Sequence, residues 1–171
     1  MRIGGGAVSI ADVTNRTARD LGFVRPFWLN EIRNDRAFHR GGALAASAGN
    51  FNEIQLFNPA GSGITVVIKR ILASVAAASG VMVRRHDPAL ATLDGTGFNL
   101  RAGGAAAQAV IRTTQIAALD GTRISEQLLG ASVITPIAED WNKELPANTG
   151  LLVTGRGVNI ELMVYYEWNE V

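Results

Sequence analysis

Residues 158–169, with the sequence VNIELMVYYEWN, carry the clearest structural pattern in the chain. Every second residue is apolar, and these side chains share one face of an extended strand: Val158, Ile160, Leu162, Val164, Tyr166 and Trp168. The residues between them fall on the opposite face: Asn159, Glu161, Met163, Tyr165, Glu167 and Asn169. Because successive side chains of a strand point to opposite faces, this alternation predicts a half-buried β-strand.

Working outward from this strand, the chain shows more short β-rich segments separated by turn formers. We expect strands at residues 53–58, 64–72, 80–86, 107–114, 132–137 and 151–154, and turns or loops at 58–63, 94–97, 120–121 and 145–150. Two β-hairpins are predicted, one joining 53–58 to 64–72 and the other joining 151–154 to 158–169. Strands and helices do not alternate, which disfavours a doubly wound α/β fold. The sequence therefore predicts an all-β, jelly-roll-like β-sandwich.

The first 50 residues differ from the rest in charge and pattern. They hold seven Arg and four acidic residues, a net charge of +3. Residues 1–24 show no sustained period, a short helix is expected at 26–38, and the small-residue run 41–49 (GGALAASAG) is expected to be a linker. The predicted organisation is an extended, partly irregular N-terminal arm with its linker at residues 1–50, followed by a β-sandwich domain at residues 51–171.

Composition excludes several classes of protein. The 171 residues suit one domain, and the absence of Cys excludes a disulfide scaffold. A net charge of +1 is small for a protein that neutralises nucleic acid. No secretory signal or membrane-spanning run is visible, so we expect a chain made in the cytoplasm, with neither a membrane nor a nucleic acid as partner. Only 18% of residues are charged, and this favours burial of surface against copies of the chain or another protein.

Residues for catalysis are scarce. The chain has no Cys, and its only two histidines, His39 and His86, are 47 positions apart. Ser62 lies in a Gly-Ser-Gly turn and not in a nucleophile elbow. Glu161 and Glu167 are separated by about 20 Å along an extended strand, too far to share one glycosidic bond. We therefore predict that the protein is not an enzyme and has no catalytic residue, cofactor or metal site.

The basic residues are nearly all arginines, 14 Arg against 2 Lys. Arg forms bidentate ion pairs and is enriched at protein interfaces, and aromatic residues serve there as apolar anchors. A solvated basic segment is the alternative explanation of the arginines near the N-terminus. The predicted contacts with a neighbouring subunit are Arg16, Arg19, Arg25, Phe27, Trp28, Arg33 and Arg36.

Three stretches are similar to virion proteins of tailed bacteriophages. Residues 56–63 (LFNPAGSG), followed by the β-branched and basic run 64–70, resemble a motif of these proteins. Residues 150–153 with 158–171 (VNIELMVYYEWNEV) resemble their closing strand, and residues 13–22 (VTNRTARDLG) are similar to their N-terminal arms. The likeness covers the start, middle and end of the chain, and it contains no active-site signature.

The resemblance implies a structural protein of the particle, most like a head decoration, or cement, protein. Such a protein would sit on the outer capsid surface as a dimer or trimer, bridge subunits of the major capsid protein and brace the shell. A tail, neck or head-fibre base protein is the first alternative. A carbohydrate-binding jelly-roll module is the second, and Tyr165 and Trp141 would then be its stacking platforms.

Overall fold

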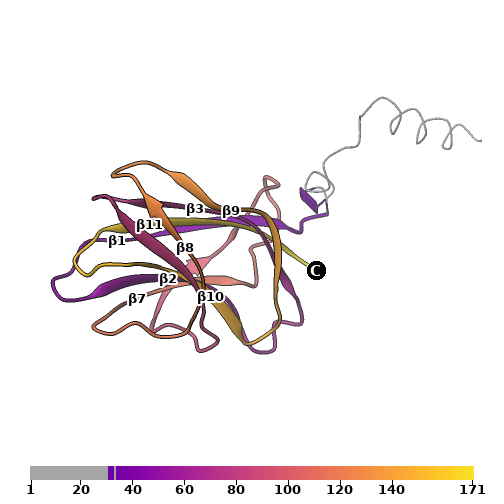
Figure 1. The fold of residues 1–171 in the computed structure, drawn as a ribbon. Helices are drawn as coiled ribbons and strands as arrows, with labels where there is room; N and C mark the ends of the chain where they lie inside the picture. The colour runs from indigo at the N-terminus through magenta and orange to yellow at the C-terminus, as the bar shows by residue number, and fades with distance from the viewer. Residues whose placement is uncertain (1–30, 33) are drawn as a thin grey trace, which may run out of the picture.

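The computed structural model describes residues 31, 32 and 34–171, and their regular structure consists almost entirely of β-strands (Figure 1). No helix in this part of the chain is long and apolar enough to cross a membrane. The predicted all-β class is confirmed. The strands in chain order are β1 (Ala37–Leu44), β2 (Phe51–Asn58), β3 (Val66–Val75), β4 (Ser79–Arg85), β5 (Thr92–Thr96), β6 (Phe98–Asn99), β7 (Val110–Ile116), β8 (Thr122–Leu129), β9 (Thr135–Leu145), β10 (Thr149–Gly155) and β11 (Leu162–Glu170).

These strands form two antiparallel sheets packed against each other. One sheet has five strands in the order β6-β1-β11-β3-β9, and the other has six in the order β5-β7-β2-β10-β4-β8. Strands β11 and β2 therefore lie inside their sheets, and each is paired on both sides. The arrangement is a β-sandwich, as the sequence predicts.

The core lies between the sheets, and the inner face of β11 is at its centre. Leu162, Val164, Tyr166 and Trp168 are each at most 1% exposed, whereas Met163 on the opposite face is 47% exposed. The alternation predicted for residues 158–169 is thus confirmed from Leu162 to Trp168, whereas Asn169, predicted on the polar face, is buried. Residues before Leu162 lie outside the strand.

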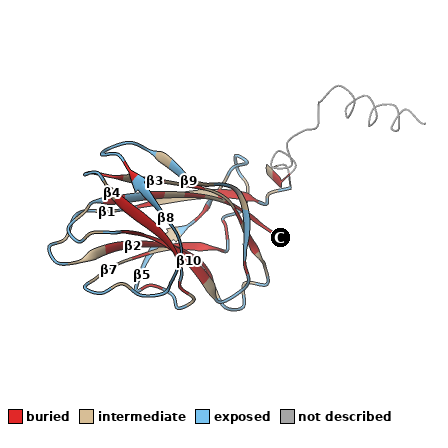
Figure 2. Ribbon diagram, in the orientation of Figure 1, coloured by how far each residue is buried: buried red, intermediate tan, exposed pale blue. Residues whose placement is uncertain are grey.

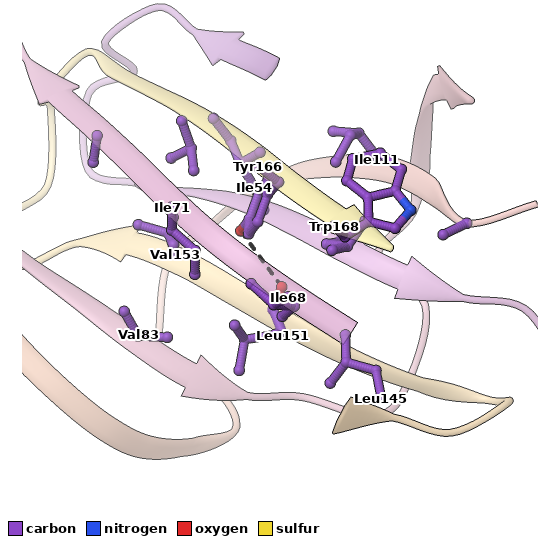
Figure 3. Packing of buried hydrophobic residues seen from close by; sticks show 14 of the residues in the cluster. Ile54, Ile68, Ile71, Val83, Ile111, Leu145, Leu151, Val153, Tyr166 and Trp168 are labelled. Atoms are coloured by element: carbon purple, nitrogen blue, oxygen red, sulfur yellow. Dashed lines mark hydrogen bonds between the residues drawn. The ribbon is translucent and has the colours of Figure 1, made fainter. Parts of the chain in front are cut away.

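Tyr166 links the two sheets directly. Its hydroxyl donates to the backbone carbonyl of Ile54 in β2 at 2.8 Å, and the carbonyl oxygen of Leu151 in β10 lies 3.4 Å away. Trp168 stacks on Phe38 of β1, with 6.2 Å between ring centroids. Figure 3 shows the two large rings of β11 among the aliphatic side chains of both sheets. Aromatic rings bury much apolar area, and the buried hydroxyl finds a partner, so this strand contributes strongly to stability.

The two predicted hairpins are wrong, because each pair of strands is divided between the sheets. β2 pairs with β10 and β7, while β3 pairs with β11 and β9; likewise β10 and β11 belong to opposite sheets. The turn at residues 59–65 is long enough to carry the chain across. Asn58 stabilises this crossing, since its Nδ2 donates to the carbonyls of Ile64 at 3.0 Å and Leu145 at 2.9 Å.

The sandwich begins at Ala37 and not at residue 51. Residues 41–44, expected in the linker, form the second half of β1, and Ala37 and Phe38 begin this strand where the end of a helix was expected. β1 runs beside β11 in continuous register. A Cβ on Gly42 would lie 3.0 Å from Ile54 Cγ2 of the other sheet, so a small residue is needed where the sheets approach. The small residues that suggested a linker instead permit close packing.

Two other strands differ from expectation. β5 includes residues 94–96, which were predicted as a turn, and its pairing with β7 is irregular between Leu93 and Gly95. β8 was not predicted at all. Seven of its eight residues are exposed, so its sequence carries no alternation of buried and exposed side chains. Its position depends on pairing with β4 alone.

The contact between Gly97 and the ring of Trp168 gives a test of the core. A Cβ at Gly97 would lie 2.3 Å from Trp168 Cζ2, so Gly97→Ala should destabilise the protein by about 1–3 kcal/mol through overpacking. Gly130→Ala is the matched control, because its Cβ would meet only Val133 Cγ2 at 3.8 Å. Urea unfolding of both variants measures the difference, and equal midpoints would contradict the packing described.

Candidate functional site

The outward-facing sides of the two sheets differ in how well they are covered (Figure 2). In β2, Glu53 and Gln55 point away from the core, yet they are only 1% and 0% exposed. In the five-stranded sheet, by contrast, β11 and β3 alternate between buried inner positions and at least partly exposed outer positions along most of their length. We call the outward side of the five-stranded sheet the open face.

A hollow of about 340 Å³ lies on the open face. Its lining comes from β3, β11 and the segment before β9, and consists of Arg70, Leu72, Ala73, Ser74, Ile134, Met163, Tyr165 and Glu167. Ile134 and Met163 are strongly exposed apolar side chains. Arg70 Nη2 donates to Glu167 Oε1 at 2.7 Å. The hollow thus combines an apolar surface with one ion pair, a composition that suits contact with another protein.

An aromatic cluster flanks the hollow on the β1 side. The Tyr165 hydroxyl hydrogen-bonds with His39 Nδ1, and these two rings lie 5.4 Å apart between centroids. His39 also faces Phe98 of β6, which is an exposed aromatic side chain. The guanidinium of Arg40 lies 5.2 Å from the centroid of the Phe98 ring and donates to the Thr96 carbonyl at 2.9 Å. Phe98 is therefore supported from two sides while its surface remains open.

The ionisation of Tyr165 reflects its position in this cluster. Burial raises the pKa of the Tyr165 phenol above its ordinary value of 10, and the nearby Glu167 carboxylate raises it further, while Arg70 acts in the opposite direction. The phenol therefore stays protonated at neutral pH. It is available to share a hydrogen bond with His39.

The covered face of the six-stranded sheet holds a second polar group of residues. Burial raises the pKa of the Glu53 carboxyl from 4.5 to about 7, although the electrostatic effects of His86 and Arg84 oppose the rise. Glu53 Oε1 has no hydrogen-bond partner among the described residues, nor have Nε and Nη1 of Arg84. Across the described part of the chain, no three His, Asp or Glu side chains gather in a way that could hold a metal ion.

Most of the predicted site residues lie outside the described residues: Arg16, Arg19, Arg25, Phe27, Trp28 and Arg33. Arg36 is described, and it is an exposed residue directly before β1. Its backbone N–H donates to the Glu31 carbonyl at 2.8 Å, and its carbonyl accepts from the Glu170 N–H at 2.9 Å. These bonds hold the start of the sandwich beside the end of β11.

Sequence reasoning missed the open face as a site. Met163 and Tyr165 fall on the exposed side of the strand pattern, and two large apolar or aromatic residues among polar ones were the available signal. The presence of Leu72, Ile134 and Phe98 on the open face could not be predicted from the strand pattern. Only the sheet order places β3, the segment before β9, and β6 near β11. Of the two proposed sugar platforms, Trp141 packs against the core, and Tyr165 is bonded to His39.

Comparison of this chain with protein-family models, curated proteins and solved structures finds no match. The functional argument therefore depends on the surface geometry and on the residues themselves.

Spectrophotometric titration of the phenols tests the environment of the two tyrosines, which are the only ones in the chain. Burial raises the pKa of both Tyr165 and Tyr166, so the folded protein should form tyrosinate only above pH 10. The unfolded chain should titrate near the ordinary value of about 10. Folding stability should consequently fall as pH rises through this range, because the folded state retains protons that the unfolded state has released. Titration of either phenol below pH 10 in the folded protein would contradict the structure.

Proposed function

We propose that this chain is a non-enzymatic structural protein of a tailed-bacteriophage virion, which decorates the outer surface of the capsid and stabilises it by bridging major capsid subunits. The observation that carries the proposal is the open face, where the apolar hollow and Phe98 are exposed. The likeness of residues 13–22, 56–70, 150–153 and 158–171 to virion proteins supplies the identity of the partner.

The open face has the physical properties that a protein-binding surface needs. Its apolar side chains gain free energy when another surface excludes water from them. The Arg70–Glu167 pair at 2.7 Å is partly exposed, so it supplies polar contacts at the edge of such an interface. A particle presents many identical sites, so many modest contacts together stabilise the shell.

The N-terminal residues complete the proposed footprint. Arg36 lies directly before β1, and β1 borders β11 on the same sheet. We propose that Arg16, Arg19, Arg25, Phe27, Trp28, Arg33 and Arg36 contact the capsid or a neighbouring subunit. A dimer or trimer built on a jelly-roll-like sandwich is part of this proposal.

A count of copies in purified virions tests the function and separates it from the main alternative. On the order of hundreds of copies per particle, measured by quantitative mass spectrometry, would support decoration of the shell. On the order of tens or fewer would assign the chain to a tail, neck or head-fibre base. Absence from the particle would overturn both. Binding on a glycan array would instead favour the carbohydrate-binding module.

Charged substitutions on the open face should weaken attachment without unfolding the chain. Leu72→Glu and Met163→Glu each place a carboxylate among the apolar side chains of the hollow. Because an unpaired charge would lose its water on docking, we expect binding to expanded heads to fall at least about tenfold. Val158→Glu is the control, because Val158 is exposed but lies outside the sheets. Co-sedimentation with heads lacking the protein measures attachment. Unchanged binding by both variants would remove the open face from the interface.

A further inference from the structure

Two connections cross the outer side of the six-stranded sheet. The chain leaves β4 and must pass β10, β2 and β7 to reach β5, and it leaves β7 and must pass β2, β10 and β4 to reach β8. The first connection spans residues 86–91 and the second residues 117–121. These two crossings explain why outward-pointing residues of β2 and β10 are buried.

The first connection is held by Gln55 and by Arg112, which donates to the carbonyls of Leu90 and Ala91 and stays charged at every ordinary pH. Gln55 Nε2 donates to the carbonyls of His86 at 2.7 Å and Pro88 at 2.9 Å, and Gln55 Oε1 accepts from the Leu90 N–H at 2.9 Å. Since an amide does not titrate, these bonds are insensitive to pH in the ordinary range.

The second connection is held by ionisable side chains. Arg84 Nη2 donates to the Gly121 carbonyl at 2.7 Å, and His86 Nε2 lies 3.2 Å from Asp120 Oδ2. The N–H of Gly121, and then His86, lower the pKa of the Asp120 carboxyl, which stays ionised. Arg84 of β4 and His86 of the first connection therefore hold residues 120–121.

Glu53 lies on the same outward face of β2, two residues before Gln55. Its neighbours across the sheet are uncharged, Thr154 of β10 and Thr114 of β7. The charged or titratable groups that act on it are Arg84 of β4, His86 of the first connection and Asp120 of the second. Glu53 is 1% exposed, and neither its Oε1 nor the Nε and Nη1 of Arg84 have a hydrogen-bond partner in the described structure. A buried carboxylate without a partner is unstable unless it takes up a proton or gains a donor.

We propose that Glu53 and Arg84 form a proton-controlled latch, which holds residues 117–121 against the six-stranded sheet while Glu53 is protonated and loosens them when it ionises. In the protonated state Glu53 is neutral and Arg84 stays bonded to Gly121. On ionisation the carboxylate attracts the unpartnered Nε and Nη1 of Arg84 away from the connection and draws water into the buried site. Both effects weaken the single bond between Arg84 and the connection.

The direction of the pH dependence follows from proton binding. The folded chain keeps the Glu53 proton up to about pH 7, whereas an unfolded chain releases it near the ordinary pKa of 4.5. Between these values the folded state binds more protons, so the latch is most stable below pH 4.5 and loses this stabilisation as pH rises through 7. This latch is independent of what binds the open face, which belongs to the other sheet.

Hydrogen–deuterium exchange, corrected for the intrinsic pH dependence of amide exchange, tests the latch. β8 follows the second connection and pairs only with β4, so peptides covering residues 117–129 report its opening. In the natural chain we expect protection of these peptides to fall at least about tenfold between about pH 5.5 and about pH 8. Glu53→Gln, an uncharged analogue of the protonated acid, should show no such fall. Glu139→Gln, at an exposed position of β9, is the matched control and should follow the natural chain.

Two results would overturn the proposal: constant protection of residues 117–129 in the natural chain, or a pH-dependent loss that persists in Glu53→Gln. If Glu53→Gln does not fold, carbon-13 NMR titration of the natural chain decides the matter. One glutamate carboxyl should titrate near pH 7, together with a shift in the amide signal of Gly121. Titration of all glutamates at their ordinary values would exclude the latch.

Discussion

The rest of the structure depends on the buried inner face of β11 and on the bond from Tyr166 to the opposite sheet. Tyr166 and Trp168 supply the largest fully buried side chains, and the Tyr166 hydroxyl reaches the Ile54 carbonyl of β2 at 2.8 Å. This contact joins the two sheets directly within the apolar core. The carboxylate of Glu170 extends the constraint, because it accepts hydrogen bonds from the N–H groups of Gln108 and Ala109 and from the Trp168 indole.

Side-chain amides on β2 position the loops around this core. Asn52 Nδ2 donates to the carbonyls of Leu44, Ala45 and Ile160, Asn58 holds the crossing between the sheets, and Gln55 holds the connection at residues 86–91. Buried polar groups are costly unless they are bonded, so these three residues are tolerated in a central strand because each satisfies a backbone group that has left the sheets. One strand thus organises loops that are far apart in the sequence.

The unequal covering of the sheets gives the molecule two different outer sides. The six-stranded sheet is covered by its own crossing connections, and this burial places Glu53 where its charge is poorly solvated. The five-stranded sheet has no such crossing among the described residues, and its apolar hollow and Phe98 stay exposed. Exposed apolar surface of the second kind suits contact with another protein, whereas the first kind buries polar side chains such as Glu53 under the connections.

The sequence by itself determined the all-β class and the inward set of residues on β11, because a strict two-residue alternation of apolar and polar side chains is compatible with little else than a half-buried strand. It also located most of the strands. Only the tertiary structure decided which strands pair, and it divided both predicted hairpins between the sheets. It alone revealed that Gly41 and Gly42 belong to a strand, that the exposed β8 exists, and that Glu53 and Gln55 are buried. The physical reason is that pairing and covering depend on contacts between residues distant in the chain, about which local alternation carries no information.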